Sequence, residues 1–475
     1  MDILESFVDQ VNGLLWDYVL IFLLCGTGIY FTIRLGFIQI RHFGTGVKEL
    51  FGGLSLRGDK AGKHGMSSFQ AVATAIAGQV GTGNLAGPAT AILAGGPGAI
   101  FWMWVSSFLG MSTIYVEAIL AQKFKTKDRN GQLVGGPAYY IEQGLKSKWL
   151  ACTFAVLIIF ALGFIGNMVQ SNAIASAFNS SLGMPNWVVG AVMAVIAGIV
   201  IIGGIRSIAS FSEKVVPVMA VFYLIGAFTI LVLNYEYVLP AFESIFIAAF
   251  NPQAVVGGGV GIGIQQAMRF GIARGLFANE AGMGSTPHAH AVARVVRPEQ
   301  QGFIAMMGVF VVCLIVTVTA LVIITSGMKE WDAAGRVGES FLSIFQGQGI
   351  TVTQQAYTYV FGYFGSIFIA ISLFFFAFTT IIGWYYYAEN NVRYLFSSMS
   401  AVRIYQLIVV CFIFIASLFK VELVWKLADM FNGLMVLPNL AALLLLSPIV
   451  IKLGKLADYG TRVPYIDPDV KAEHS

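Results

Sequence analysis

The sequence predicts an all-α polytopic membrane protein of about eleven transmembrane helices, one peripheral and ten forming a 5+5 inverted repeat with two broken helices. Three observations predict this fold. The 475 residues are 57% hydrophobic and only 11% charged, with a mean hydropathy of +0.79, which is too apolar for a soluble domain. Eleven apolar stretches are long enough to cross a bilayer. The second and the seventh of them are interrupted by glycine-rich runs.

The apolar stretches alternate with loops whose charges indicate their orientation. The expected spans are residues 14–31, 68–93, 99–121, 150–178, 187–203, 215–233, 265–292, 303–326, 361–387, 404–419 and 423–450. The loop after the first span is rich in Lys and Arg, so the positive-inside rule places it in the cytoplasm. The connection 234–261 contains Glu236 and Glu243 but no Lys or Arg, which fits an external loop. We therefore expect the N-terminus outside and the C-terminus in the cytoplasm.

These spans divide the chain into six parts. If the first span is set aside, the glycine-rich breaks lie in the first and the sixth of the ten that remain. Because five is an odd number, the second copy of a five-helix unit enters the membrane from the opposite side. The expected parts are a peripheral N-terminal helix (1–33), a cytoplasmic basic loop (34–67), a first five-helix repeat (68–235), an external loop (236–264), a second five-helix repeat (265–451) and a cytoplasmic tail (452–475).

The two interrupted spans share one pattern. Residues 78–88 read GQVGTGNLAGP and residues 279–287 read NEAGMGSTP, each with Gly-x-Gly followed by a proline where a new half-helix could begin. Glycine favours a break in the helix. Unpaired backbone at membrane depth is tolerated only where it lines a cavity, so a polar site is expected between the two breaks. Such a pair of broken segments is the best sequence indication of a transporter's binding site.

Composition and motifs argue against other classes of protein. The basic residues lie mainly in loops, so the net charge of +4 does not suggest a nucleic-acid partner. The four cysteines lie in apolar segments and are expected to be small buried hydrophobes. His288 and His290 are two positions apart and cannot share a helix face, so a metal site of histidines is not expected. The start of the chain is acidic, unlike a cleavable signal peptide.

Several motifs together resemble the alanine/glycine:cation symporter family. They are GGPGAIFWMWVSSFLG (95–110), VGTGNLAG (80–87), GGPAYY (135–140), RGLFANEAGMGS (274–285) and YAENN (387–391). The resemblance covers essentially the whole chain. It implies a leucine-transporter-like fold with one extra helix, and import of alanine or glycine with sodium across a bacterial or archaeal plasma membrane. Ala278 stands where the family commonly has serine, which puts any role for a hydroxyl group there in doubt.

An amino-acid substrate needs hydrogen-bond donors for its carboxylate. The backbone N–H groups of Gly81, Thr82 and Gly83, at the start of a half-helix, are suited to this role because the helix dipole also favours an anion. The alternative is that these glycines only allow close helix packing. Gln170 lies in the middle of its span and is our candidate for a further substrate contact.

The side-chain wall and the ammonium contact are expected at the second break and the eighth core helix. Phe277, Met283 and Trp384 are candidates for the wall, although each could simply be a core residue. Thr380 lies one turn from Trp384 and is also expected beside the substrate. Glu280 could accept from freed backbone N–H groups, pair with Arg274, or face the substrate ammonium.

The resemblance also implies a sodium site. It carries over the backbone oxygens of Ala77 and Val80 and the hydroxyl groups of Thr379 and Thr380. The alternative is that these threonines hydrogen-bond only their own helix backbone.

Four ionisable groups lie in or near the apolar spans. Arg274 and Asp429 lie at depths where they could form an external gate or, equally, a permanent ion pair. Glu117 and Glu389 are expected near the cytoplasmic side, where they could pair with loop arginines.

Two other functions remain open. One is a proton-coupled amino-acid permease that uses Glu280 as a relay, and the other, less favoured, is a channel or an intramembrane enzyme. The sequence leaves open the preference among glycine, L-alanine and D-alanine.

Overall fold

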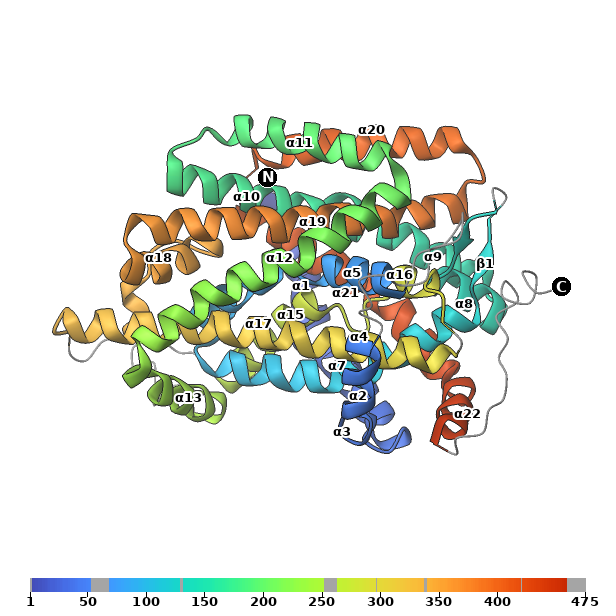
Figure 1. Cartoon of the computed structure of the whole chain (residues 1–475), viewed down its shortest axis with the longest axis horizontal. Helices are drawn as coiled ribbons and strands as arrows, with labels where there is room; N and C mark the ends of the chain where they lie inside the picture. Colours follow the sequence, from blue (N-terminus) through green and yellow to red (C-terminus); the bar gives the residue numbers. More distant parts are fainter. Residues whose placement is uncertain are drawn as a thin grey trace.

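The computed structural model of the protein describes residues 2–52, 68–128, 131–251, 263–295, 297–336, 340–419 and 421–458. In these residues the chain is almost entirely helical, and most long helices run along the longest axis of the molecule (Figure 1). The sheet of the described part is an antiparallel pair, β1 (Thr126–Lys127) and β2 (Leu133–Val134). Parts of the expected basic loop (53–67), external loop (252–262) and C-terminal tail (459–475) lie outside the described residues.

Eight helices of the described chain are long and apolar enough to cross a membrane, and α11 (Asn186–Ile202) is a shorter apolar helix. The eight cover Leu4–Arg34, Gly98–Lys123, Lys148–Leu182, Gly204–Leu233, Pro298–Ala333, Tyr363–Leu395, Met399–Ala416 and Glu422–Leu445. Large apolar side chains on the outside of α12 (Gly204–Leu233), such as Val218 and Val232, are exposed, as lipid-facing residues would be. The polytopic all-α class is confirmed. The two interrupted spans consist of shorter helices, so the count of eleven stays a prediction.

The first break lies between α5 (Ser68–Gln79) and α6 (Thr82–Gly95). Gly81 has an extended backbone (φ −128°, ψ −152°) and α6 restarts directly after it. The expectation that Pro88 begins the new half-helix is wrong, because Pro88 lies inside α6. There it removes one backbone hydrogen bond without ending the helix.

The second break lies between α15 (Ile264–Asn279) and α16 (Pro287–Ala291). Here the prediction for proline is right, since Pro287 is at the first turn of α16. Between the two helices Glu280, Gly282 and Gly284 all have positive φ, of 57°, 89° and 78°. The left-handed conformation at Glu280, which is uncommon outside glycine, ends α15, and its N–H donates to Leu276. The backbone N–H groups that follow are therefore free to bind side chains.

The helices pack as two groups that face each other across the breaks. α6, α7 (Gly98–Lys123), α15 and α17 (Pro298–Ala333) pack together, and so do α10 (Asn167–Leu182), α11, α19 (Tyr363–Leu395) and α20 (Met399–Ala416). Figure 1 shows α10, α11 and α20 along one side of the molecule and α7 and α17 along the other. The two breaks thus lie where these two groups of helices meet.

The first span is one continuous helical rod of three elements, which we call the N-terminal helix. It comprises α1 (Asp2–Gly13), the π-helix η1 (Leu14–Val19) and α2 (Leu20–Arg34). It packs against α7, η1 contacts α15, and all three elements contact α21 (Val421–Leu445). The N-terminal helix therefore touches both the first packed layer and α21.

Shorter elements complete the chain. α13 occupies part of the connection 236–264, which was expected to be an external loop, and it packs on α7. A second π-helix, η2, lies between α9 and α10. These elements are α3 (Ile38–Arg41), α4 (Phe43–Gly52), α8 (Pro137–Leu145), α9 (Lys148–Ile158), η2 (Ile159–Gly166), α13 (Tyr235–Phe250), η3 (Phe341–Ile344), α18 (Ile350–Phe361) and α22 (Ser447–Asp458).

Candidate functional site

The start of α6 binds a side chain from α10. The Thr82 backbone N–H donates to Gln170 Oε1 at 2.9 Å, and the Thr82 hydroxyl donates to the same oxygen at 2.6 Å. Both residues are fully buried. Gln170 Nε2 has no hydrogen-bond partner among the described residues. The amide oxygen of Gln170 thus occupies a place at the helix start that suits a carboxylate oxygen.

Gly81 separates this contact from a second one on α19. The Thr380 hydroxyl donates to the Ala77 carbonyl at 2.9 Å and lies 3.1 Å from the Phe376 carbonyl oxygen. A Cβ atom at Gly81 would lie 2.4 Å from Thr380 Oγ1 and 3.0 Å from Gln170 Oε1, so only glycine fits here. The first break therefore brings α5, α6, α10 and α19 together at one glycine.

The other two residues expected in the sodium site are arranged differently. The Thr379 hydroxyl donates to Phe376 in its own helix at 2.9 Å and lies 3.8 Å from Met219 Sδ of α12. It is therefore directed at α12, away from Ala77. Val80 is buried at the break, where its N–H still donates to Ile76 as the last bond of α5. In this structure Ala77 and Thr380 are in contact, whereas Thr379 makes a separate interaction.

Glu280 is buried in the second break and is held by side chains. Trp384 Nε1 donates to Glu280 Oε1 at 2.6 Å, and the Ser285 hydroxyl donates to Oε2. Of the three expected interactions, pairing with Arg274 is wrong, because both terminal nitrogens of Arg274 bind Asp429. The Glu280 side chain therefore lies beside Trp384, one of the expected wall residues.

Sequence reasoning missed the role of Glu117. The expectation that it pairs with loop arginines near the cytoplasm is wrong, because it is fully buried against the second break. The N–H groups of Gly284 and Gly282 donate to its two oxygens at 2.9 and 3.1 Å, and Asn439 Nδ2 donates to it at 2.7 Å. A signal was present, since a carboxylate in an apolar span needs donors and a glycine break frees backbone N–H groups.

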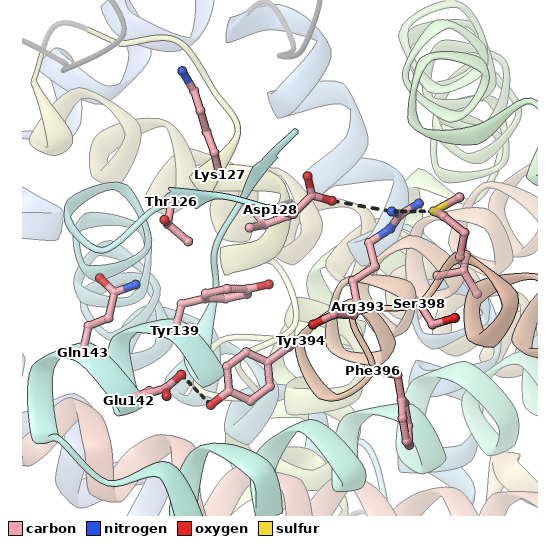
Figure 2. A pocket seen from close by; sticks show the side chains of 14 residues that line it. Thr126, Lys127, Asp128, Tyr139, Glu142, Gln143, Arg393, Tyr394, Phe396 and Ser398 are labelled. Atoms are coloured by element: carbon pink, nitrogen blue, oxygen red, sulfur yellow. Dashed lines mark hydrogen bonds and ion pairs between the residues drawn. The ribbon is translucent and has the colours of Figure 1, made fainter. Parts of the chain in front are cut away.

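Glu389 binds an arginine, but Arg393 belongs to its own helix, α19, and not to a loop as expected. Its Oε1 accepts from Arg393 at 2.5 Å, and Tyr385 donates to its Oε2. Arg393 also lies 3.6 Å from Asp128, in the hairpin after α7. Figure 2 shows Arg393 and Asp128 among the residues that line a cavity of about 310 Å³. There Arg393 links the end of α19 to the hairpin.

The expected wall residues are buried beside the breaks. The rings of Phe277 and Trp384 meet edge to face at 5.6 Å, and Trp384 is only 1% exposed. A Cβ atom at Gly166 would lie 2.5 Å from Trp384 Cζ3, so η2 leaves room for the indole. Met283 is fully buried in the unwound segment. The space next to Glu280 is thus largely filled by aromatic rings.

Arg274 and Asp429 form a two-bond ion pair between α15 and α21, with N–O distances of 2.8 and 2.6 Å. The Arg274 guanidinium also lies 4.7 Å above the Trp425 ring, which contacts Phe277 at 5.0 Å. Arg274, Trp425 and Asp429, which we call the ion-pair layer, all line a cavity of about 790 Å³; we call it the outer cavity after the expected orientation of the chain. The ion-pair layer therefore lies between the outer cavity and Phe277.

The chain is similar to a family of transporters over nearly its whole length. The sodium:alanine symporter family matches residues 1–465. The sodium/alanine symporter AgcS of Methanococcus maripaludis is 41% identical over 94% of this chain and 95% of its own length. The amino-acid carrier protein AlsT of Bacillus subtilis is 40% identical over 99% and 95%. The probable sodium/glutamine symporter GlnT of Bacillus subtilis is 41% identical over 94% and 89%.

Among solved structures, a manganese transporter of Eremococcus coleocola has a similar fold. Its TM-score is 0.50 at 13% identity, covering 86% of this chain and 90% of that chain. At this identity the likeness bears on the fold alone, and it agrees with the expected leucine-transporter-like architecture.

Proposed function

Because the chain belongs to the sodium:alanine symporter family, a family of multi-pass amino-acid/cation symporters, we propose that it imports alanine or glycine together with sodium. The observation that carries this proposal is the first break, where Gly81 lies between Thr380 and Gln170. The proposed sodium site and the proposed carboxylate site then lie on either side of Gly81. Binding of the ion and binding of the amino acid would therefore affect each other.

The sodium ion would bind at the end of α5. Freed carbonyl oxygens at the end of a half-helix are typical ligands of Na⁺ in transporters with broken helices. The Ala77 carbonyl and the Thr380 hydroxyl are already in contact at 2.9 Å. The Val80 carbonyl and, after rotation of its side chain, the Thr379 hydroxyl would complete the oxygen set. On this proposal the ion replaces the hydrogen bond from Thr380 to Ala77.

The substrate carboxylate would bind the N–H groups at the start of α6. In the described structure Gln170 Oε1 accepts from the Thr82 N–H and hydroxyl, so Gln170 must turn away to admit a carboxylate. Its Nε2, buried without a partner among the described residues, would then be free to donate to the substrate. The ammonium group would face Glu280, and the side chain would face Phe277, Met283 and Trp384.

Alternating access would come from rocking of the two packed layers, with 68–235 and 265–451 as inverted repeats in a bacterial or archaeal plasma membrane. We propose that the N-terminus and the outer cavity face outside and that the C-terminus is cytoplasmic, as the loop charges favour. The Arg274–Asp429 pair and Trp425 would then close the outer path. The alternative, a permanent ion pair, would keep this layer closed throughout the cycle.

The test is uptake of labelled alanine and glycine into proteoliposomes, with and without an inward sodium gradient. We expect Thr380→Val to abolish gradient-driven uptake in folded protein, because the ion loses an oxygen ligand. Thr325→Val is the matched control, since Thr325 is a buried threonine of α17 bonded to its own helix through Val322. Unchanged sodium activation in Thr380→Val would show that sodium does not bind at this site. Loss in Thr379→Val as well would place both hydroxyls on the ion.

The same experiment addresses the second candidate function, proton coupling through Glu280. Burial of this carboxylate beside the wall residues is the observation that favours it. A pH gradient alone would then drive uptake, and Glu280→Gln would abolish that uptake. Glutamine belongs in the substrate panel, because a relative at 41% identity is named for glutamine.

A further inference from the structure

The N-terminal helix is bonded to both helices that carry the outer ion pair. Trp16 Nε1 donates to the backbone carbonyl of Asp429 itself, at 3.2 Å, on α21. Asp17 pairs with Arg269 of α15 at 3.0 Å, five residues before Arg274. The N-terminal helix thus reaches the same two helices that the Arg274–Asp429 pair joins.

A second set of contacts holds the N-terminal helix to α21. Asn12 Nδ2 donates to the Lys426 carbonyl at 2.9 Å, and the Lys426 ammonium pairs with Asp9 at 3.0 Å. Further along α21, a Cβ atom at Gly433 would lie 2.9 Å from Leu20 Cδ1, so glycine permits the close approach of the two helices. The contact with α21 therefore extends over several turns.

Trp16 and Asp17 lie in the π-helical segment of the N-terminal helix. In this segment, η1, the backbone is wider than in an α-helix. Both residues line the outer cavity, but Trp16 is buried and bonds α21, whereas Asp17 binds α15. Single π-helical turns are rare and are often found at functional sites.

We propose that the N-terminal helix is a clamp on the outer gate, in which Trp16 and Asp17 are positioning residues for the Arg274–Asp429 pair. This inference rests on the proposed alternating-access function. To open the outer path, α15 must move away from α21, and the N-terminal helix cannot follow both. Opening therefore breaks either the Asp17–Arg269 pair or the bonds to α21, so the clamp favours the closed state.

The test measures opening directly. Asn432 lies one turn inward of Asp429 on α21 and is only 2% exposed. Asn432→Cys, in protein whose four native cysteines are replaced, reports opening through its rate of labelling by a membrane-impermeant thiol reagent. The labelling is measured in proteoliposomes without substrate, so that it does not depend on which amino acid is carried.

We expect Asp17→Asn and Trp16→Phe each to speed this labelling about two- to fivefold, the range expected for one partly exposed ion pair or one hydrogen bond. The exchanged pair, Asp17→Arg with Arg269→Asp, should restore the slow rate. Glu5→Gln is the control for loss of charge alone, because it removes from the same helix one acidic group whose electrostatic interaction, within the described residues, is with Lys426 of α21 and not with Arg269.

Unchanged labelling in Asp17→Asn would overturn the clamp, even if Trp16→Phe failed to fold. Faster labelling that the exchanged pair does not reverse would also overturn it, because the effect would not come from the Asp17–Arg269 contact. The two proposals can fail separately. Faster labelling in Asp17→Asn without uptake of alanine or glycine would support the clamp and contradict the proposed substrate. Sodium-driven uptake of alanine or glycine with unchanged labelling would support the proposed function and contradict the clamp.

Discussion

Replacement of Trp384 tests whether its indole limits the size of the substrate. The side chain is 1% exposed, meets Phe277 at 5.6 Å and donates to Glu280 at 2.6 Å. Two variants separate its roles. Trp384→Ala removes both the ring volume and the N–H donor, whereas Trp384→Phe removes the donor but keeps an aromatic ring.

The expected magnitudes follow from burial. Loss of a buried indole costs about 3–5 kcal/mol of stability if its space stays empty, and a charged group that loses one donor costs about 1.5–3 kcal/mol. A larger substrate can fill part of that space. Each added CH₂ group contributes about 0.8 kcal/mol, so valine, two carbons larger than alanine, should gain roughly 1.6 kcal/mol, or about 15-fold, relative to alanine.

The assay is competition of labelled alanine binding by glycine, alanine, valine and leucine at equal amounts of folded protein. We expect Trp384→Ala to shift the rank order toward valine and leucine and to weaken alanine, with a smaller shift in Trp384→Phe. Trp102→Ala is the control, because Trp102 packs α7 on α13 and donates to Ala249. An unchanged rank order in Trp384→Ala, with a uniform loss for all four amino acids, would refute the assignment of Trp384 to the pocket.

Three further predictions concern the breaks and the outer gate. Gly81→Ala should abolish the rise in Tm that sodium causes, because the new Cβ atom would lie 2.4 Å from Thr380 Oγ1. Gly87→Ala is the control and should keep that rise, because a Cβ atom at Gly87 meets no atom within 4 Å in the described structure. If the two variants respond equally to sodium, the proposed sodium site is contradicted. Glu117→Gln should lower Tm by weakening charged hydrogen bonds worth about 1.5–3 kcal/mol each, and an unchanged Tm would show that the carboxylate does not hold the second break. Asp429→Asn should speed labelling of Asn432→Cys and raise the KM for alanine, since it weakens a buried pair with Arg274; if neither changes, the pair is not a gate.

The positions of the two breaks could be predicted because their cause is local. Gly282 and Gly284 adopt positive φ, which glycine reaches without strain, whereas Gly81 has an extended backbone that any residue can adopt and is glycine because its neighbours leave no room for a Cβ atom. Pro287 begins its half-helix for a reason equally local, since its φ suits a first turn and its missing N–H costs nothing there. The same argument failed at Pro88, because α6 begins at Thr82, directly after Gly81, and Pro88 lies inside it.

The contacts between helices could not be predicted in the same way. Gln170 meets Thr82 across 88 positions, and Glu117 meets Gly282 across 165. Which face of one helix meets which turn of another depends on the packing of all the helices between them, and no local pattern records it. The sequence therefore identified Glu117 as an ionisable group inside a span, but not the backbone N–H groups that bind it.

The order of synthesis gives the N-terminal helix an unusual position. Asp9 and Lys426 are 417 residues apart, so the N-terminal helix is synthesised well before its partner on α21. At about 5–20 residues per second, roughly 20–80 seconds separate the synthesis of the two residues. The contacts of Trp16 with α21, and the Arg274–Asp429 pair itself, can therefore form only after α21 has been made. A chain truncated before α21 would lack both Asp429 and the surface that receives Trp16.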